Sequence, residues 1–156
     1  MKIAFFGHAE FYKKQEFTAP LLSLLEERIK DDPAEIFFGG YGEFDSFAHR
    51  CCQKYKESHP GVRLVFVTPY YTEDYQKRYL EYIKKDYDEI VYPEIEKVPK
   101  RFAISKRNLW MAQAADLVIC YVEHDWGGAY KACHRAARMK KEVINLAPLS
   151  PDEHFW

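Results

Sequence analysis

The sequence predicts an α/β fold, a Rossmann-like, open and mostly parallel sheet with helices on both faces. Short apolar runs alternate along the chain with amphipathic segments, as expected of strands joined by crossover helices. Several of these runs end at glycine or proline, as a buried strand does when it delivers a loop at its carboxyl end. The chain has 156 residues, 47% of them hydrophobic, which is enough apolar material for one full core. We therefore expect a single domain over residues 1–156, with 147–156 as a C-terminal tail.

The first half of the chain contains three predicted strands. KIAFFG stops at Gly7, AEIFF is followed by a pair of glycines, and VRLVFV is followed by Thr68 and Pro69. Proline cannot continue a central strand, so the third strand ends there. The helix after the first strand is expected to begin at Thr18, a residue type that caps helices, with Pro20 in its first turn. FDSFAHRCCQKYKES places apolar residues at helical spacing and predicts the next helix.

The second half continues the alternation. TEDYQKRYLEYIKKDY predicts an amphipathic helix, and DEIVYPE a short strand that ends at Pro93. KRFAISKRNLWMAQAA predicts a helix with a basic beginning, followed by the strand DLVICYV, the turn EHDWGGAY, the helix KACHRAARMKK and a last strand, EVINLAP. Phe155 and Trp156 lie in the tail, and we expect them to dock on the domain or to contact another subunit.

The composition disfavours several classes of protein. The 23 Lys and Arg nearly balance the 24 Asp and Glu, so no global positive field favours strong binding of duplex DNA. No stretch approaches the roughly 20 apolar residues of a membrane helix, and the first residues lack the core of a signal peptide, so we expect a cytoplasmic protein without a membrane partner. Neither the cysteines nor the histidines have the spacing of a metal site, and we expect neither metal nor cofactor. Tyrosines between residues 70 and 82 and the aromatic tail favour a homo-oligomer.

In an open parallel sheet a ligand binds beyond the carboxyl ends of the strands, at the point where the strand order reverses. This rule selects the loops that follow the predicted strands. The candidate ligand-binding residues in them are Gly7, His8, Gly39, Gly40, Gly42, Thr68, Gly127, Gly128 and Ala129.

Two of these loops, GGYGEFD and WGGAY, place glycines directly before a predicted helix. Glycine lets backbone amides approach an anion closely, and the helix dipole adds a partial positive charge there. Arg101 and Arg107, in the basic segment that follows Lys100, are candidates to complete the site, because arginine can hold a phosphate with two parallel hydrogen bonds. For each glycine loop taken alone, a tight turn is the more common explanation, and a solvated helix face accounts equally well for the basic segment.

The stretch from Lys100 to Leu146 resembles the C-terminal half of the SLOG superfamily, which includes Smf/DprA, the Lonely Guy phosphoribohydrolases and the YpsA-like proteins. The shared features are an Arg-Asn-x-x-Met element on a helix, an Asp before an apolar strand, a double glycine that opens the next helix, and a final strand that ends in VINL. GGYGEFDSFAHRCC resembles the first glycine loop of the YpsA-like branch. The resemblance implies a nucleotide-derived ligand and a site that contains Gly39, Gly40, Asp45, Arg107, Asn108, Met111, Gly127, Gly128 and Ala129.

The leading functional hypothesis is a module that senses or sequesters a nucleotide or a nucleotide-derived small molecule. The first alternative is a nucleotide N-glycosidase or phosphoribohydrolase-like enzyme, in which a carboxylate acts at the sugar carbon as the base leaves. However, WGGAYKACHR lacks both the Gly-Thr and the Glu of the Lonely Guy pattern, so no catalytic residue is assigned. The carboxylates that remain candidates are Glu43, Asp45, Glu123 and Asp125.

The second alternative is a protein associated with single-stranded nucleic acid. Arg101, Lys106 and Arg107 would then form a basic strip beside tyrosines on which bases stack. The sequence alone does not decide between these functions.

Overall fold

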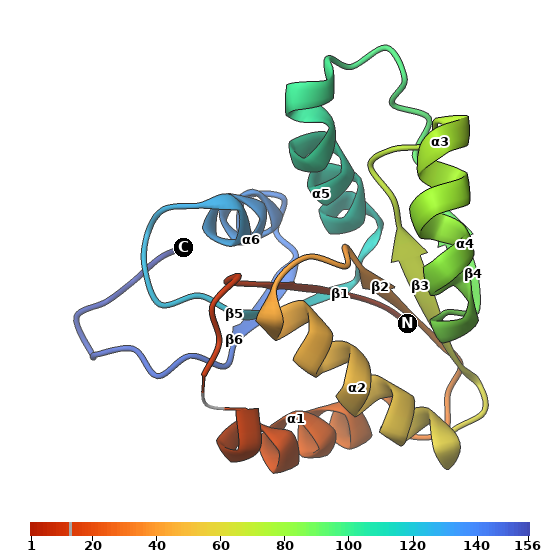
Figure 1. The fold of residues 1–156 in the computed structure, drawn as a ribbon. Coiled ribbons are helices and arrows are strands. Elements are labelled where there is room, and N and C mark those ends of the chain that lie inside the picture. The colour runs from red at the N-terminus through yellow and green to blue at the C-terminus, as the bar shows by residue number, and fades with distance from the viewer. Residues whose placement is uncertain (13) are drawn as a thin grey trace.

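The apolar runs of the sequence form the strands of one sheet. These are β1 (Lys2–Gly7), β2 (Ala34–Phe38), β3 (Val62–Val67), β4 (Glu89–Val91), β5 (Leu117–Tyr121) and β6 (Glu142–Asn145). The computed structural model describes residues 1–12 and 14–156, and within them the six strands pair in the order β4-β3-β2-β1-β5-β6 (Figure 1). Every pair is parallel. The structure confirms the α/β, Rossmann-like fold class, and the sheet is wholly rather than mostly parallel.

The amphipathic segments form the helices between the strands. The longer ones are α1 (Lys14–Ile29), α2 (Glu43–Glu57), α5 (Ala103–Ala114) and α6 (Gly128–Arg138). A continuous helical segment joins β3 to β4 and consists of α3 (Glu73–Tyr75), the π-helical turn η1 (Gln76–Leu80), α4 (Glu81–Ile83) and the 3₁₀ turn η2 (Lys84–Asp86). A short 3₁₀ turn, η3 (Lys100–Phe102), leads into α5.

The helices cover both faces of the sheet, as predicted (Figure 1). Successive strand residues point to opposite faces. Ile3 and Phe5 of β1 therefore pack in the core beneath α1 and α2, while Ala4 and Phe6 pack in the core beneath α5 and α6. Each face of the sheet thus has its own layer of buried side chains.

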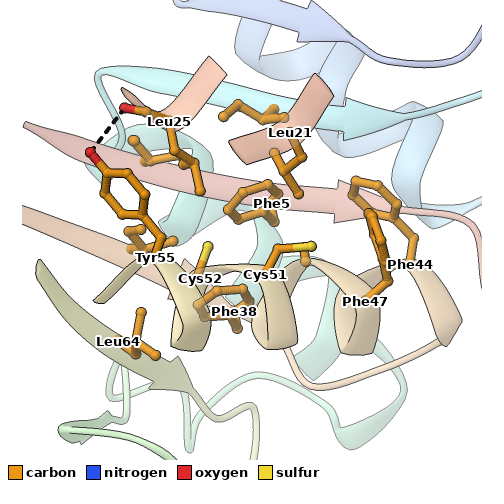
Figure 2. Close-up of a cluster of buried hydrophobic side chains, with 14 of the residues drawn as sticks. Phe5, Leu21, Leu25, Phe38, Phe44, Phe47, Cys51, Cys52, Tyr55 and Leu64 are labelled. Atoms are coloured by element: carbon orange, nitrogen blue, oxygen red, sulfur yellow. Dashed lines mark hydrogen bonds between the residues drawn. The ribbon is translucent and has the colours of Figure 1, made fainter. Parts of the chain in front are cut away.

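Several aromatic rings pack among aliphatic side chains in the core beneath α1 and α2 (Figure 2). The ring of Phe5 stacks on that of Phe38 in β2, with 5.5 Å between centroids, and lies 6.2 Å from the ring of Phe44 in α2. The hydroxyl of Tyr55, near the end of α2, donates a 3.5 Å hydrogen bond to the carbonyl oxygen of Leu25 in α1. These contacts fix α1 and α2 against each other and against the sheet.

The prediction that the first helix begins at Thr18 is wrong, because α1 begins at Lys14 and contains Pro20. Proline removes one hydrogen bond inside a helix. Here Pro20 is exposed, while Leu21 and Leu25 are fully buried in the core. Burial of the apolar stripe of α1 therefore outweighs the local preference for a helix that starts near the proline.

The C-terminal tail packs against α6. The ring of Phe155 lies 5.9 Å from that of Tyr130 in α6 and contacts the core beneath this helix, and Trp156 lies 6.4 Å from Tyr130. Docking on the domain is thus the outcome for the tail, and a homo-oligomer stays a prediction. Across the described residues, no helix combines the length and the apolar character needed to cross a membrane.

Replacing Phe5 with alanine should lower the free energy of unfolding by about 3–5 kcal/mol, because the ring is buried in a core that cannot collapse fully around the cavity. The exposed Tyr82, which is 69% accessible, provides a matched control, since its truncation to alanine removes an aromatic ring but little buried surface. Urea unfolding followed by circular dichroism would measure both. Equal losses for the two variants would contradict the assignment of Phe5 to the core.

Candidate functional site

The strand order reverses between β1 and β5. The chain builds β1 to β4 toward one edge of the sheet and then returns, so that β5 pairs with the other side of β1. A pocket of about 580 Å³ lies at the carboxyl ends of the strands around this point. Ligands of open α/β sheets bind at such a reversal. The predicted site residues that line this pocket are Gly7, His8, Gly39, Asp45, Arg107, Asn108, Met111, Gly127, Gly128 and Ala129.

The other predicted residues do not line the pocket. Gly40 and Gly42 lie in the loop before α2, and both have backbone φ angles in the left-handed region, 73° and 93°. Thr68 is fully buried, and its hydroxyl donates a 2.7 Å hydrogen bond to the carbonyl oxygen of Tyr70. Arg101 is exposed on η3 and packs over the ring of Phe102. These residues shape the surrounding loops rather than the pocket wall.

The site predicted from the sequence lacks Tyr41, His124 and Trp126, whose aromatic rings also line the pocket. Tyr41 is 71% exposed and Trp126 is 66% exposed, unusually high for large rings in a pocket wall. Tyr41 and Trp126 each lie next to a loop glycine at a strand end, so an exposed aromatic residue in that position was the available signal.

Three rings form a continuous stack beyond the carboxyl ends of β1 and β5. His8 stacks on His124 with 3.8 Å between centroids, and His124 stacks on Trp126 with 3.7 Å. The planes of adjacent rings differ by 14° and 13°. The stack presents the largely exposed ring of Trp126 as a flat surface at the pocket rim.

His8 holds a defined protonation state within this stack. Its Nε2 accepts a 2.8 Å hydrogen bond from the backbone amide of Glu123, so in the neutral ring the proton lies on Nδ1. Burial, followed by the neighbouring His124, lowers the pKa of His8, while the charge of Glu123 opposes them. His8 is therefore neutral at physiological pH, and one of its ring nitrogens accepts a hydrogen bond from the loop that follows β5.

The second glycine loop opens α6 toward the pocket. Gly127 is the N-cap residue and has a φ of 93°, a conformation that a residue with a Cβ rarely adopts. A Cβ at Gly128 would meet no atom within 4 Å, so space remains in front of the first turn. No side chain in the described part of the chain caps this helix end. The first amides of α6 and the helix dipole thus favour an anion at this end of the pocket.

The first glycine loop is arranged differently, because the chain's own carboxylate binds its amides. Oδ2 of Asp45, in the first turn of α2, accepts a 3.0 Å hydrogen bond from the amide of Gly40. The amide of Gly39 also contributes to this interaction. Of the two glycine loops, the one before α6 therefore offers its amides to an external anion.

Arg107 links α5 to the ends of two strands. Its side chain is only 3% exposed, and Nη1 donates hydrogen bonds of 2.9 Å to the carbonyl oxygen of Gly39 and 2.7 Å to that of Val67. Its Nε donates to Oδ1 of Asn108 at 2.9 Å. The guanidinium thus forms part of the pocket wall and is held there by hydrogen bonds to the chain itself.

Asp45 is the one of the four candidate carboxylates that lines the pocket. Burial raises the pKa of Asp45 to about 7, although the amide of Gly40 and the positive charge of Arg107 act in the opposite direction. A carboxyl group with such a pKa exchanges a proton near neutral pH, which is a property common at functional sites.

No family model matches this chain, and no curated protein matches it. Solved structures do match it, among them two DNA processing proteins. DNA processing protein A (DprA) from Streptococcus pneumoniae superposes with a TM-score of 0.64 over 97% of this chain and 52% of that protein, at 19% identity. DprA from Helicobacter pylori, described as having a unique single-stranded DNA binding mode, superposes with a TM-score of 0.64 over 98% of this chain and 67% of that protein, at 18% identity.

The chain shares its fold with DprA. It spans about half the length of the pneumococcal protein and two thirds of the Helicobacter protein. At such low identity the likeness concerns the fold alone. It fits the predicted resemblance to the SLOG superfamily, in which DprA is included, while the closer resemblance to the YpsA-like branch stays a prediction.

The raised pKa of Asp45 makes a specific prediction for stability. An unfolded Asp ionises near pH 3.9, so between about pH 4 and pH 7 the folded protein keeps a proton that the unfolded chain has lost. Rising pH therefore lowers the free energy of unfolding in that window, by up to about 1.4 kcal/mol per pH unit, and the loss is complete above the folded pKa.

Asp45→Asn provides the comparison, because the amide oxygen can still accept the hydrogen bond of Gly40 but does not titrate. Urea unfolding of both proteins across the window should show the wild type losing stability relative to the variant as the pH rises. Parallel profiles would mean that Asp45 is already ionised throughout.

Proposed function

We propose that the pocket between β1 and β5 binds a phosphorylated nucleotide unit. The observation that carries the proposal is that an uncapped helix N-terminus and an exposed aromatic stack line the same pocket. The phosphate lies before Gly128, where the amides of α6 receive it, and the base stacks on Trp126. The pocket volume of about 580 Å³ is within the range of small-ligand sites.

The geometry supports different partners at the two ends of this ligand. At the α6 end, backbone amides and the helix dipole provide positive charge without a basic side chain. At the other end, a base can stack on the exposed tryptophan without any sequence-specific contact. In the first glycine loop the side chain of Asp45 already occupies the backbone amide of Gly40. The loop before α6 is therefore the proposed position for the phosphate.

Two sources of such a unit are distinguishable: a free nucleotide or nucleotide-derived molecule, and one residue of a single strand of DNA. The likeness of the fold to Helicobacter DprA, described by its single-stranded DNA binding mode, supports the strand. The exposed Tyr41, at the same rim as Trp126, also supports it, because a strand needs several platforms for successive bases. The formal net charge of −1 disfavours strong binding to a duplex.

Hydrolysis of a nucleotide is the second candidate function, and the position of Asp45 favours it. This carboxyl lines the pocket, and because burial raises its pKa to about 7 it is present in both protonated and ionised forms near neutral pH. An N-glycosidase needs a carboxyl group beside the sugar carbon from which the base leaves. Incubation with nucleotides followed by mass spectrometry separates the two functions, since binding returns the nucleotide intact and hydrolysis releases the free base.

Gly128→Asp should weaken nucleotide binding by about tenfold or more, because it places a carboxylate where the phosphate lies. The fold should tolerate the change, since a Cβ at this position meets nothing and an acidic residue stabilises a helix N-terminus. Gly128→Asn is the matched control, with the same shape and no charge. Isothermal titration with ADP would contradict the proposed phosphate position if both variants bound alike.

Trp126→Ala should weaken binding by about 1–3 kcal/mol, the usual contribution of one base stacked on an aromatic ring. Stacking should also quench the fluorescence of Trp126, and Trp126→Phe should keep most of the affinity while abolishing the quench. Unchanged affinity in the alanine variant would exclude the ring as the platform for the base.

Titration with mononucleotides, ADP-ribose and an oligothymidylate tests the source of the ligand. Tighter binding of the oligonucleotide, with an affinity that falls steeply as salt rises, identifies the strand. Equal or tighter binding of a mononucleotide identifies the free molecule. If none of these raises the melting temperature at saturating concentration, the proposal of a nucleotide site is wrong.

A further inference from the structure

A second, larger cavity lies beside the pocket described above. It has a volume of about 1000 Å³, is open to solvent on one side, and is lined by the loop after β3, α3, the segment after β4 and the beginning of α5. The first turn of α5 separates the two hollows, because Ala103 lines the second cavity and Ile104 lines the pocket. The proposed function does not involve this cavity.

Tyrosine rings form the walls of the second cavity. Tyr71 stacks on Tyr92 with 5.3 Å between centroids, and Tyr70 meets Tyr75 edge to face at 5.4 Å. Tyr71 is 48% exposed although it lies within this aromatic group. The faces of these rings carry partial negative charge and attract cations.

Carboxylates lie between and around the rings. Asp74, Glu94 and Glu96 line the cavity, and Lys100 is its one basic lining residue among those described. Asp74 pairs with Arg78 at 2.8 Å and is partly neutralised. Burial and the neighbouring Glu96 raise the pKa of Tyr92, so this ring stays neutral. The lining as a whole therefore has an excess of negative charge.

The chain already places one ammonium group against this aromatic wall. Nζ of Lys100 lies 5.7 Å from the centroid of the Tyr70 ring, within the range of a cation–π contact. Lys100 is exposed and sits at the start of η3. Its side chain shows that the wall accepts a cation, and its flexible stem leaves it free to move aside.

The lining disfavours other occupants. An anion such as a phosphate would face three carboxylates and one ammonium. A metal ion needs several ligands converging on one point, and the described residues contain no such group of His, Cys, Asp or Glu. A purely apolar ligand would gain nothing from the charge of the carboxylates, of which Asp74 pairs with Arg78 and Glu96 interacts with Tyr92. A positively charged organic group satisfies both the rings and the acids.

We propose that this second cavity binds a weakly hydrated organic cation, a guanidinium or quaternary ammonium group, between the tyrosine rings and the carboxylates of Glu94 and Glu96. Such cations lose little hydration on entering an aromatic site and stack well on ring faces. The group belongs either to a free small molecule or to an arginine side chain of a peptide.

Pairs of probes that differ only in charge test the site in the full chain. Acetyl-arginine amide should bind in isothermal titration while its neutral isostere, acetyl-citrulline amide, should not. Choline should likewise bind better than its neutral carbon isostere. A short peptide with one central arginine then distinguishes the sources, because tighter binding than that of the single amino acid indicates a peptide partner.

Variants locate the binding in the cavity. Tyr71→Leu should weaken arginine binding by about fivefold, whereas Tyr71→Phe should retain it because the ring face remains. Glu94→Gln should also weaken it, by about two- to fivefold. Lys100→Met should strengthen it, because it removes the competing ammonium. Melting temperatures close to that of the wild type establish that each variant is folded.

Equal binding of the charged and neutral probes, or no binding of either cation at millimolar concentration, would overturn the proposal. So would weaker binding by Lys100→Met. Gly128→Asp should leave arginine binding unchanged, which keeps this test separate from that of the nucleotide pocket.

Discussion

The parallel pairing of β1 with both β2 and β5 is the constraint from which the site follows. Parallel strands bring all their carboxyl ends to one edge, and the reversal around β1 separates the loops there, so that a hollow remains between them. Loops from distant parts of the chain thereby meet. His8 and His124 stack at 3.8 Å because their strands are neighbours in the sheet, although they are far apart in the sequence. The helices pack on both faces of the sheet beneath these loops.

The two glycine loops at this edge have different roles. In the loop before α2, Asp45 accepts the hydrogen bond of Gly40, and the guanidinium of Arg107 donates to the carbonyl oxygen of Gly39. Among the described residues neither α2 nor α6 has a side-chain cap, but only the loop before α2 has its glycine amides bound by a carboxylate of the chain. The first loop is thus held by interactions within the chain, while the second leaves its amides for a ligand. Because Arg107 is buried and hydrogen-bonded within the chain, it forms part of the pocket wall and is not free to bind a phosphate with both arms of its guanidinium.

The sequence predicted the strands and most of the pocket lining, because apolar runs that end in glycine carry both signals at once. It did not predict the ring stack, since strand order cannot be read from periodicity and His124 has no local feature that marks it. The start of α1 was also wrong, because tertiary burial of Leu21 and Leu25 outweighs a local proline signal. The burial of Arg107 likewise depends on where α5 crosses the ends of β2 and β3, which no single segment reveals.

Gly7 connects the floor of the pocket with the hydrophobic core. A Cβ at this position would lie 2.1 Å from Cδ1 of Phe44, whose ring packs on Phe5. The pocket and the core are therefore in direct contact at this point, and a substitution that changes the packing of one also changes the shape of the other. Substitutions near Phe44 must preserve both the core packing and the pocket geometry. The residues around Phe44 should therefore vary less among related sequences than those on the α1 side of the same core.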